Sequence, residues 1–177
     1  DWGGWGGRYE FYLPQKAPIF GKKERYPIWT NANDTVPDGR GGFVTGNHAT
    51  IWRWREAVQN DFLVRLRWTE VSEFEKAVHA PVVRLATPSV SEVKAGARVT
   101  MSAKGTYDPN GLPLKYHWFY YKEAGNYAGT VWIDDCDKEE ASLVVPDQAC
   151  TLHVVLEVTN EGTPEVTRYA RVILNVK

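Results

Sequence analysis

The chain has 177 residues, of which 43% are hydrophobic, so it can bury a core in one large domain or two small ones. Its formal net charge of −1 argues against a general nucleic-acid binder, and its apolar runs are too short to cross a bilayer, so neither nucleic acid nor a membrane is an expected partner. Aromatic residues are abundant instead: eight Trp, nine Tyr and six Phe make up 13% of the sequence.

The first 46 residues are rich in glycine and proline, which excludes a regular helix or a long strand there. Among them are four candidate binding residues, Trp2, Trp5, Tyr9 and Trp29. On a flexible backbone, flat rings of this kind can stack on the apolar faces of sugar rings. The same rings can instead anchor an irregular segment onto a larger protein body, and the sequence leaves both interpretations open.

A polar cluster follows Trp29, in which Thr30, Asn31, Asn33 and Asp34 offer side-chain oxygens. Such oxygens are ligands for a hard cation, so Asp34 is a candidate contact for calcium, and they also bind the hydroxyl groups of a ligand. Alternatively, the Asn and Asp side chains satisfy the local backbone of a turn. Calcium is the one cofactor that the sequence suggests.

One helix is predicted over residues 47–67, with Thr45 or Asn47 as its N-cap. Apolar residues recur in it at steps of three and four, which places one hydrophobic stripe along the helix. The stripe consists of Ile51, Trp54, Val58, Phe62 and Leu66.

From residue 79 onward the hydrophobic period changes to two, which predicts β-strands separated by turn signals such as the Asp-Pro-Asn-Gly of residues 108–111. About seven short strands of this kind are typical of an antiparallel β-sandwich of immunoglobulin type, and we place Trp118 in its core. We therefore predict a mainly β protein with two parts, a loop-rich segment with one helix over residues 1–78 and a sandwich over 79–177. Strands are expected at 82–86, 98–103, 113–121, 130–133, 142–145, 152–158 and 170–176.

The predicted sandwich carries a second group of candidate sugar-contacting rings, Tyr120, Tyr121, Tyr127 and Trp132. Two cysteines, Cys136 and Cys150, allow either one disulfide or two free thiols. The sequence has no HExxH, no Cys–His zinc spacing, no GxSxG and no phosphate loop. This favours a non-catalytic role, although a pair of glycosidase carboxylates far apart in the sequence stays open.

Several short motifs along the chain are distinctive. They are Gly4-Trp5-Gly6-Gly7-Arg8-Tyr9-Glu10, Pro27-Ile28-Trp29-Thr30-Asn31-Ala32 with Asp34, Ala49-Thr50-Ile51-Trp52-Arg53-Trp54-Arg55, Asn60-Asp61-Phe62, Asp108-Pro109-Asn110-Gly111, Tyr121-Lys122-Glu123-Ala124-Gly125 with Tyr127, and Leu152-His153-Val154 with Leu156-Glu157-Val158-Thr159. Through them, the chain resembles the C-terminal part of a family of secreted bacterial proteins that are called cellulose-binding and whose N-terminal half is similar to nucleoside hydrolases.

The resemblance implies that residues 1–78 are the tail of the nucleoside-hydrolase-like α/β domain and that residues 79–177 are its appended immunoglobulin-like sandwich. It also implies a secreted or periplasmic location and two partners: a glycan such as cellulose or another plant polysaccharide, and the N-terminal domain of the parent protein. Nucleoside hydrolases have a late-chain Asp that binds calcium and ribose. Asp34 could take that place, although Asn33 replaces the histidine beside it.

Three hypotheses of function follow. The first is a non-catalytic, carbohydrate-associated region. The second is part of a calcium-dependent nucleoside- or glycoside-hydrolase-like enzyme whose main active-site residues lie outside this chain. The third is a purely structural accessory domain.

Overall fold

The computed structural model describes residues 7–12 and 26–177, so Trp2 and Trp5 lie outside the described residues. The chain is mainly β, as predicted, and it divides into two compact units, Asp1–Glu56 and Ala57–Lys177. The domain boundary expected after residue 78 stays a prediction, because a division by compactness does not test which part folds alone.

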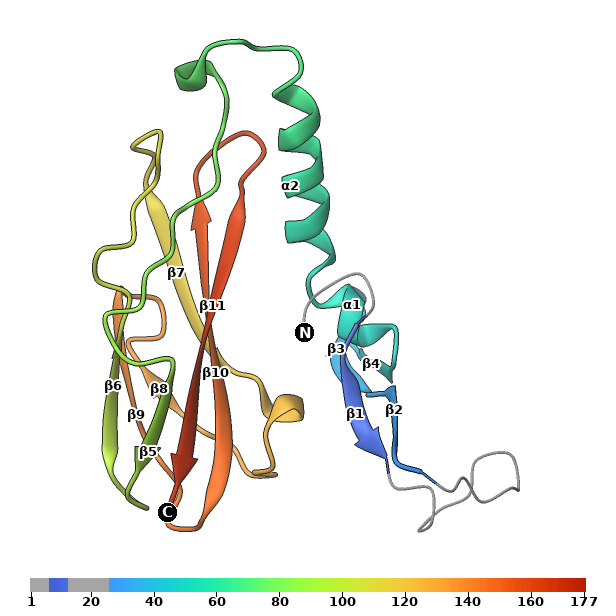
Figure 1. Ribbon diagram of the computed structural model, residues 1–177, viewed down its shortest axis with the longest axis vertical. Helices are drawn as coiled ribbons and strands as arrows, with labels where there is room; N and C mark the ends of the chain where they lie inside the picture. Colours follow the sequence, from blue (N-terminus) through green and yellow to red (C-terminus); the bar gives the residue numbers. More distant parts are fainter. Residues whose placement is uncertain (1–6, 13–25) are drawn as a thin grey trace. The chain divides into compact units, whose positions relative to one another are not determined.

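The first unit contains two small antiparallel hairpins (Figure 1). Strand β1 (Tyr9–Tyr12) pairs with β2 (Ile28–Asn31), and β3 (Asp34–Pro37) pairs with β4 (Phe43–Gly46). Each of these strands has four residues, so the described ranges 7–12 and 26–46 contain no long strand. In the turn after β3, the carboxylate of Asp38 accepts the backbone N–H groups of Arg40 and Gly42 at 2.7 and 2.9 Å.

The helix expected over residues 47–67 is divided into α1 (Ala49–Trp52) and α2 (Arg55–Arg67). Neither predicted cap is present: His48 holds the N-cap position of α1, and it makes no side-chain cap hydrogen bond. The residues of the predicted stripe are not buried together. Ile51, Trp54 and Val58 are half-buried and Phe62 and Leu66 are exposed, whereas Val64 is the buried residue of α2.

The second unit contains a β-sandwich of a four-stranded and a three-stranded sheet (Figure 1). The strand order is β5-β11-β10-β7 in one sheet and β6-β9-β8 in the other, and all neighbours are antiparallel except β5 and β11. Two short 3-10 turns, η1 (Phe74–Lys76) and η2 (Lys122–Ala124), lie outside the sheets. The strands are β5 (Val90–Val93), β6 (Arg98–Ser102), β7 (Leu114–Tyr120), β8 (Ile133–Asp134), β9 (Glu140–Val144), β10 (Cys150–Asn160) and β11 (Thr167–Val176).

Five of the seven predicted strands correspond to strands of the sandwich. Of the other two, 130–133 shares only Ile133 with β8, and 82–86 makes only an isolated bridge from Val82 to Tyr107. Strand β5 was not predicted. Trp118 is 1% exposed and lies in the core between the sheets, as predicted, where its indole N–H donates to the carbonyl of Lys138 at 2.9 Å. Cys136 and Cys150 are free thiols, so the disulfide alternative is wrong.

An aromatic stack joins the segment after α2 to the sandwich. The ring of His79 stacks on Phe74 at 3.8 Å and on Trp68 at 5.3 Å between ring centroids. The backbone N–H of His79 also donates to Oδ1 of Asn110 at 2.9 Å, and Asn160 Nδ2 donates to the His79 carbonyl at 2.8 Å. Ring contacts and hydrogen bonds together therefore fix this segment against the sandwich.

The Asp108 turn is structural, as one reading of its sequence predicts. Its carboxylate accepts the backbone N–H groups of Asn110 and Leu112 and a side-chain N–H of Asn160.

In α2, the carboxylate of Asp61 accepts hydrogen bonds from Arg168 at 2.6 Å and from Arg65 at 2.9 Å. The bond from Arg168 connects the helix to β11.

Within the described residues, no helix has the length and apolar character that crossing a membrane would require.

Candidate functional site

Three aromatic rings lie together on one face of the β1–β2 hairpin. Phe11 is directly opposite Trp29 in the register, and Tyr9 is directly opposite Asn31. Because side chains alternate between the two faces of a strand, these four residues share one face, which we call the aromatic face. The rings of Phe11 and Trp29 meet edge to face, with centroids 5.6 Å apart and an interplanar angle of 70°.

The aromatic face is open to solvent. Trp29 is 69% exposed, Phe11 56% and Tyr9 43%, and Asn31 is exposed as well. The opposite face carries less exposed positions of β2, Ile28 and Thr30. Exposed, clustered rings beside an amide can offer an apolar surface and hydrogen bonds to the same ligand.

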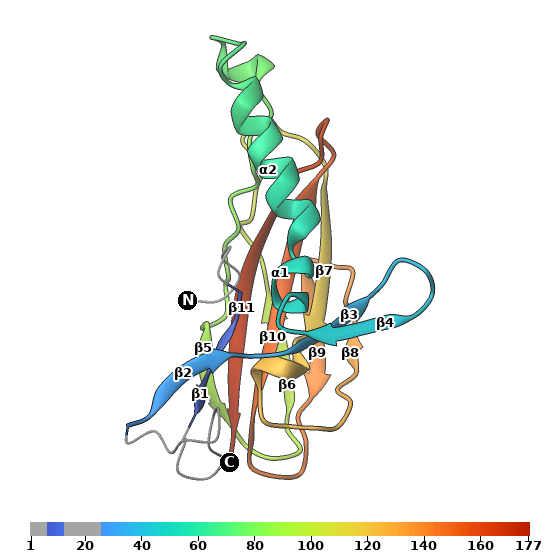
Figure 2. The ribbon, with the colours of Figure 1, turned by 90° about the vertical axis from the view of Figure 1, so that its right-hand side faces the viewer.

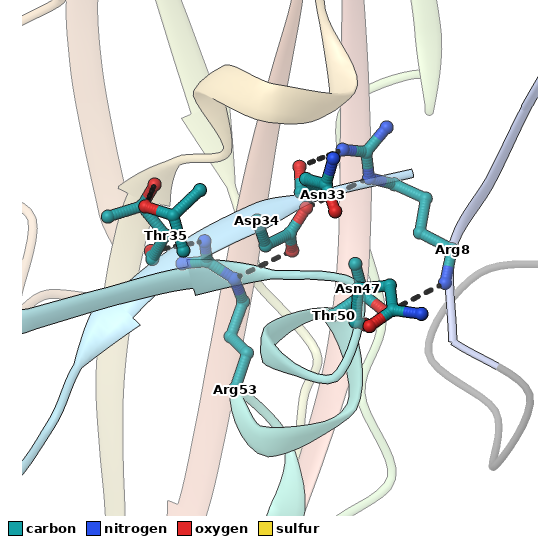
Figure 3. A network of polar contacts seen from close by, with 8 residues as sticks. Arg8, Asn33, Asp34, Thr35, Asn47, Thr50 and Arg53 are labelled. Carbon is teal, nitrogen blue, oxygen red and sulfur yellow. Dashed lines mark hydrogen bonds and ion pairs between the residues drawn. The ribbon is translucent and has the colours of Figure 1, made fainter. Parts of the chain in front are cut away.

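A buried ion-pair network holds the two hairpins together (Figure 3). Asp34 is fully buried, and its Oδ1 accepts hydrogen bonds from Nε and Nη2 of Arg8 at 3.0 and 2.9 Å. Its Oδ2 accepts from Nε of Arg53 at 3.3 Å. The same guanidinium groups also reach the backbone: Nη2 of Arg8 donates to the Asn33 carbonyl at 2.8 Å, and Nη2 of Arg53 to the Thr35 carbonyl at 3.1 Å.

Helix α1 is connected to the same network through Thr50. The Thr50 hydroxyl accepts the backbone N–H of Arg8 at 3.2 Å and donates to the Asn47 carbonyl at 2.6 Å. Gly7, with a φ of +76°, allows this approach, because a Cβ atom there would clash with the Thr50 hydroxyl. One end of β1, the start of β3 and α1 are therefore fixed to one another.

The calcium contact suggested for Asp34 stays a prediction, and this geometry gives the carboxylate other partners. Two guanidinium groups bind its carboxylate oxygens, and their positive charges would repel a calcium ion at the same place. The sequence alone could not reveal this, since Arg8 and Arg53 are distant from Asp34 along the chain. In the part of the chain that the structure describes, no three His, Cys, Asp or Glu side chains gather to form a metal site.

The candidate rings on the sandwich do not form a comparable surface. Tyr121 is 3% exposed, so its ring is not available to a ligand, because it is covered by neighbouring atoms. Tyr120 and Tyr127 are half-buried, and the Tyr120 hydroxyl donates to the Tyr127 carbonyl at 2.6 Å. Trp132 is 79% exposed and is the candidate of this group that still presents its ring to solvent.

Of the predicted site residues in the first unit, the structure brings Tyr9 and Trp29 together. Phe11 and Asn31 complete the face, and neither was predicted as a carbohydrate contact. The signal was present in the sequence: Tyr9 and Phe11 are two residues apart, as are Trp29 and Asn31, which is the spacing of one strand face.

Residues 98–176 match the family described as the C-terminal domain of the cellulose-binding protein Sde0182. A solved structure of a nucleoside hydrolase-related protein from Saccharophagus degradans, described as associated with carbohydrate metabolism, is 31% identical with a TM-score of 0.71. The alignment covers 78% of this chain but 36% of that protein, so this chain spans about a third of its relative's length.

Two other comparisons add little. A PKD domain from the KIAA 1837 protein aligns with 15% identity and a TM-score of 0.39, over 52% of this chain and 86% of that domain. A search of curated proteins returns no match. The family match over residues 98–176 and the similarity to the Saccharophagus protein confirm the resemblance that the motifs indicated.

Proposed function

We propose that this chain is a non-catalytic, carbohydrate-associated region of an extracellular protein, and that the aromatic face contacts the glycan. One observation carries the proposal: Tyr9, Phe11 and Trp29 are exposed together, on the same face as Asn31. The descriptions of the matched family and of the Saccharophagus protein, which refer to cellulose and to carbohydrate metabolism, support it.

The chemistry of the face suits an uncharged sugar. A pyranose presents C–H groups on its flat side, which pack against aromatic rings, and hydroxyl groups at its edge, which hydrogen-bond to amides. The four side chains carry no formal charge, so the face offers no electrostatic attraction to a charged ligand. Cellulose or a similar neutral plant polysaccharide is the ligand class that we propose.

Binding to amorphous cellulose and to a soluble glucan oligosaccharide tests the proposal. Trp29→Ala removes the most exposed ring of the face and should weaken binding about tenfold, which corresponds to roughly 1.4 kcal/mol. The matched control is Trp132→Ala, which removes an equally exposed indole from the sandwich and should leave binding unchanged. Loss of binding in the Trp132 variant alone would assign the site to the sandwich and contradict the aromatic face.

A structural role is the second candidate, and helix α2 favours it. Phe62, Leu63 and Leu66 are exposed on a helix of 13 residues in which Val64 is the buried side chain. A helix gains most of its stability by packing its apolar side chains, so we propose that the neighbouring nucleoside-hydrolase-like domain of the parent protein covers them. In a protein that contains both parts, Phe62→Ser with Leu66→Ser should lower the melting temperature of that domain. Gln59→Ser is the control, and equal effects of the two would contradict the docking.

The enzymatic alternative has less support. It requires Asp34 to act as a calcium ligand in the intact protein, and this carboxylate is already bound by Arg8 and Arg53. Assays of the full-length parent for nucleoside and glycoside cleavage with calcium, in comparison with Asp34→Ala, test it directly. We expect no activity that depends on Asp34 as a metal ligand.

A further inference from the structure

The aromatic face continues into a longer exposed strip. From Trp29 to Pro37, every second residue is exposed, while Ala32, Asp34 and Val36 between them are buried. The backbone N–H of Ala32 donates to the Arg8 carbonyl at 2.9 Å and extends the β1–β2 ladder toward β3. Figure 2 shows β2 and β3 following one another along nearly one line.

The partner strands widen this strip at both ends. At the β2 end, Phe11 and Tyr9 are opposite Trp29 and Asn31. At the β3 end, Thr45 is opposite Thr35, with 2.8 Å between their hydroxyl oxygens, and Phe43 is opposite Pro37. Phe43 is 74% exposed. We define the strip by its nine residues: Tyr9, Phe11, Trp29, Asn31, Asn33, Thr35, Pro37, Phe43 and Thr45.

The length and chemistry of the strip point to a polymer. Eight residue steps at about 3.3 Å each give a length of about 26 Å, which exceeds a single sugar ring several times. Aromatic rings lie at both ends, and amides and hydroxyls lie between them. None of the nine side chains carries a formal charge, which matches a neutral, hydroxyl-rich chain and disfavours an acidic or basic one.

The buried network gives the strip a fixed backbone. The Asn33 carbonyl is bound by Arg8 and the Thr35 carbonyl by Arg53, so both guanidinium groups that hold Asp34 also hold residues of the strip (Figure 3). A surface that is ordered before binding loses less conformational entropy when a ligand arrives.

We propose that the strip binds one extended, uncharged polysaccharide chain across several consecutive sugar units, with Trp29 and Phe43 as its two aromatic ends. This inference rests on the proposed carbohydrate contact of the aromatic face and extends it to several consecutive sugar units and to a second contact point. Because strands twist along their length, the chain that follows the strip must turn with it, which a flexible single polymer can do.

Titration with β-1,4-linked glucose oligosaccharides of increasing length tests the extension. The wild-type protein should bind a hexasaccharide more tightly than a disaccharide. Phe43→Ala should weaken hexasaccharide binding about three- to tenfold and leave disaccharide binding unchanged, whereas Trp29→Ala should weaken both. Thr45→Val, which removes one hydroxyl with little change of shape, should weaken hexasaccharide binding by a smaller factor.

Phe62→Ala is the matched control, because it removes an exposed phenylalanine outside the strip. Unchanged circular dichroism and melting temperatures show that each variant is folded. If Phe43→Ala binds the hexasaccharide as tightly as the wild type while Trp29→Ala does not, the site ends at the aromatic face, and only the extension is overturned. If the wild-type protein binds neither oligosaccharide, the proposed function and the extension are both overturned.

Discussion

Arg8 and Asp34 form a buried ion pair, with 2.9 Å between Nη2 and Oδ1, although 26 residues separate them in the sequence. The pair connects the residue before β1 to the first residue of β3, and Arg53 binds the other carboxylate oxygen. A buried charge is tolerated only when its partners remain in place. The position of the exposed residues of β2 and β3 therefore depends on these three side chains behind them.

We expect Asp34→Asn to destabilise the first unit by about 3–5 kcal/mol, because the substitution leaves two arginines next to a neutral amide. Hydrogen exchange of the amides in residues 28–37 measures the effect locally. Asp38→Asn, at an exposed carboxylate in the neighbouring turn, is the control and should change exchange far less. Equal protection in Asp34→Asn and the wild type would show that the network does not hold the strip.

Trp118→Ala should destabilise the sandwich by about 3–5 kcal/mol, because it empties a large, fully buried position and removes the hydrogen bond to the Lys138 carbonyl. Trp118→Phe retains most of the volume and should cost less. Chemical denaturation, followed by circular dichroism, gives both values. Trp132→Ala, at an exposed indole, should stay within about 0.5 kcal/mol of the wild type, and a larger loss there than at Trp118 would contradict the assigned core.

Tyr120 should make the stability of the sandwich depend on alkaline pH. Burial is the main cause that raises the pKa of its hydroxyl to about 12, and the negative charges that Cys150, Tyr127 and Glu123 can carry act in the same direction. The folded state therefore keeps the proton when the unfolded chain, with an ordinary pKa of 10.0, has lost it. The resulting stabilisation is complete below about pH 10 and is lost as the pH rises toward 12.

Urea denaturation in this alkaline range measures the effect. Tyr120→Phe cannot ionise at this position, so its stability should fall less steeply with pH than that of the wild type. It should also lose about 1 kcal/mol at neutral pH, because the hydrogen bond to the Tyr127 carbonyl is absent. Parallel pH profiles of the two proteins would show that Tyr120 does not titrate as described.

The sequence was most informative where strands were long. The alternation in β7, β10 and β11 extends over seven or more residues and predicts each strand correctly. Strand β5 has four residues and pairs in parallel with β11, a long-range contact that leaves little local pattern. The burial of the helical stripe could not be predicted either, because periodicity shows that apolar residues share a face but not what covers that face.

The candidate site was predicted in part. Tyr9 and Trp29 were identified by residue type, whereas Phe11 required the cross-strand register that places it opposite Trp29. The sequence could not show the ion pairs of Asp34, because the arginines that bind its carboxylate are distant along the chain. Among the aromatic candidates on the sandwich, Tyr121 was chosen by residue type, and the sequence did not show that its ring is buried.

The ring of His79 stacks on both Phe74 and Trp68, and these contacts oppose local unfolding of this segment. Proteases cleave chains that can unfold locally and extend into their active sites, and a segment secured by ring contacts and by Asn110 and Asn160 resists that extension. Although residues 68–79 contain little regular structure, limited digestion should spare them. The smallest stable fragment should accordingly retain α2 together with the sandwich.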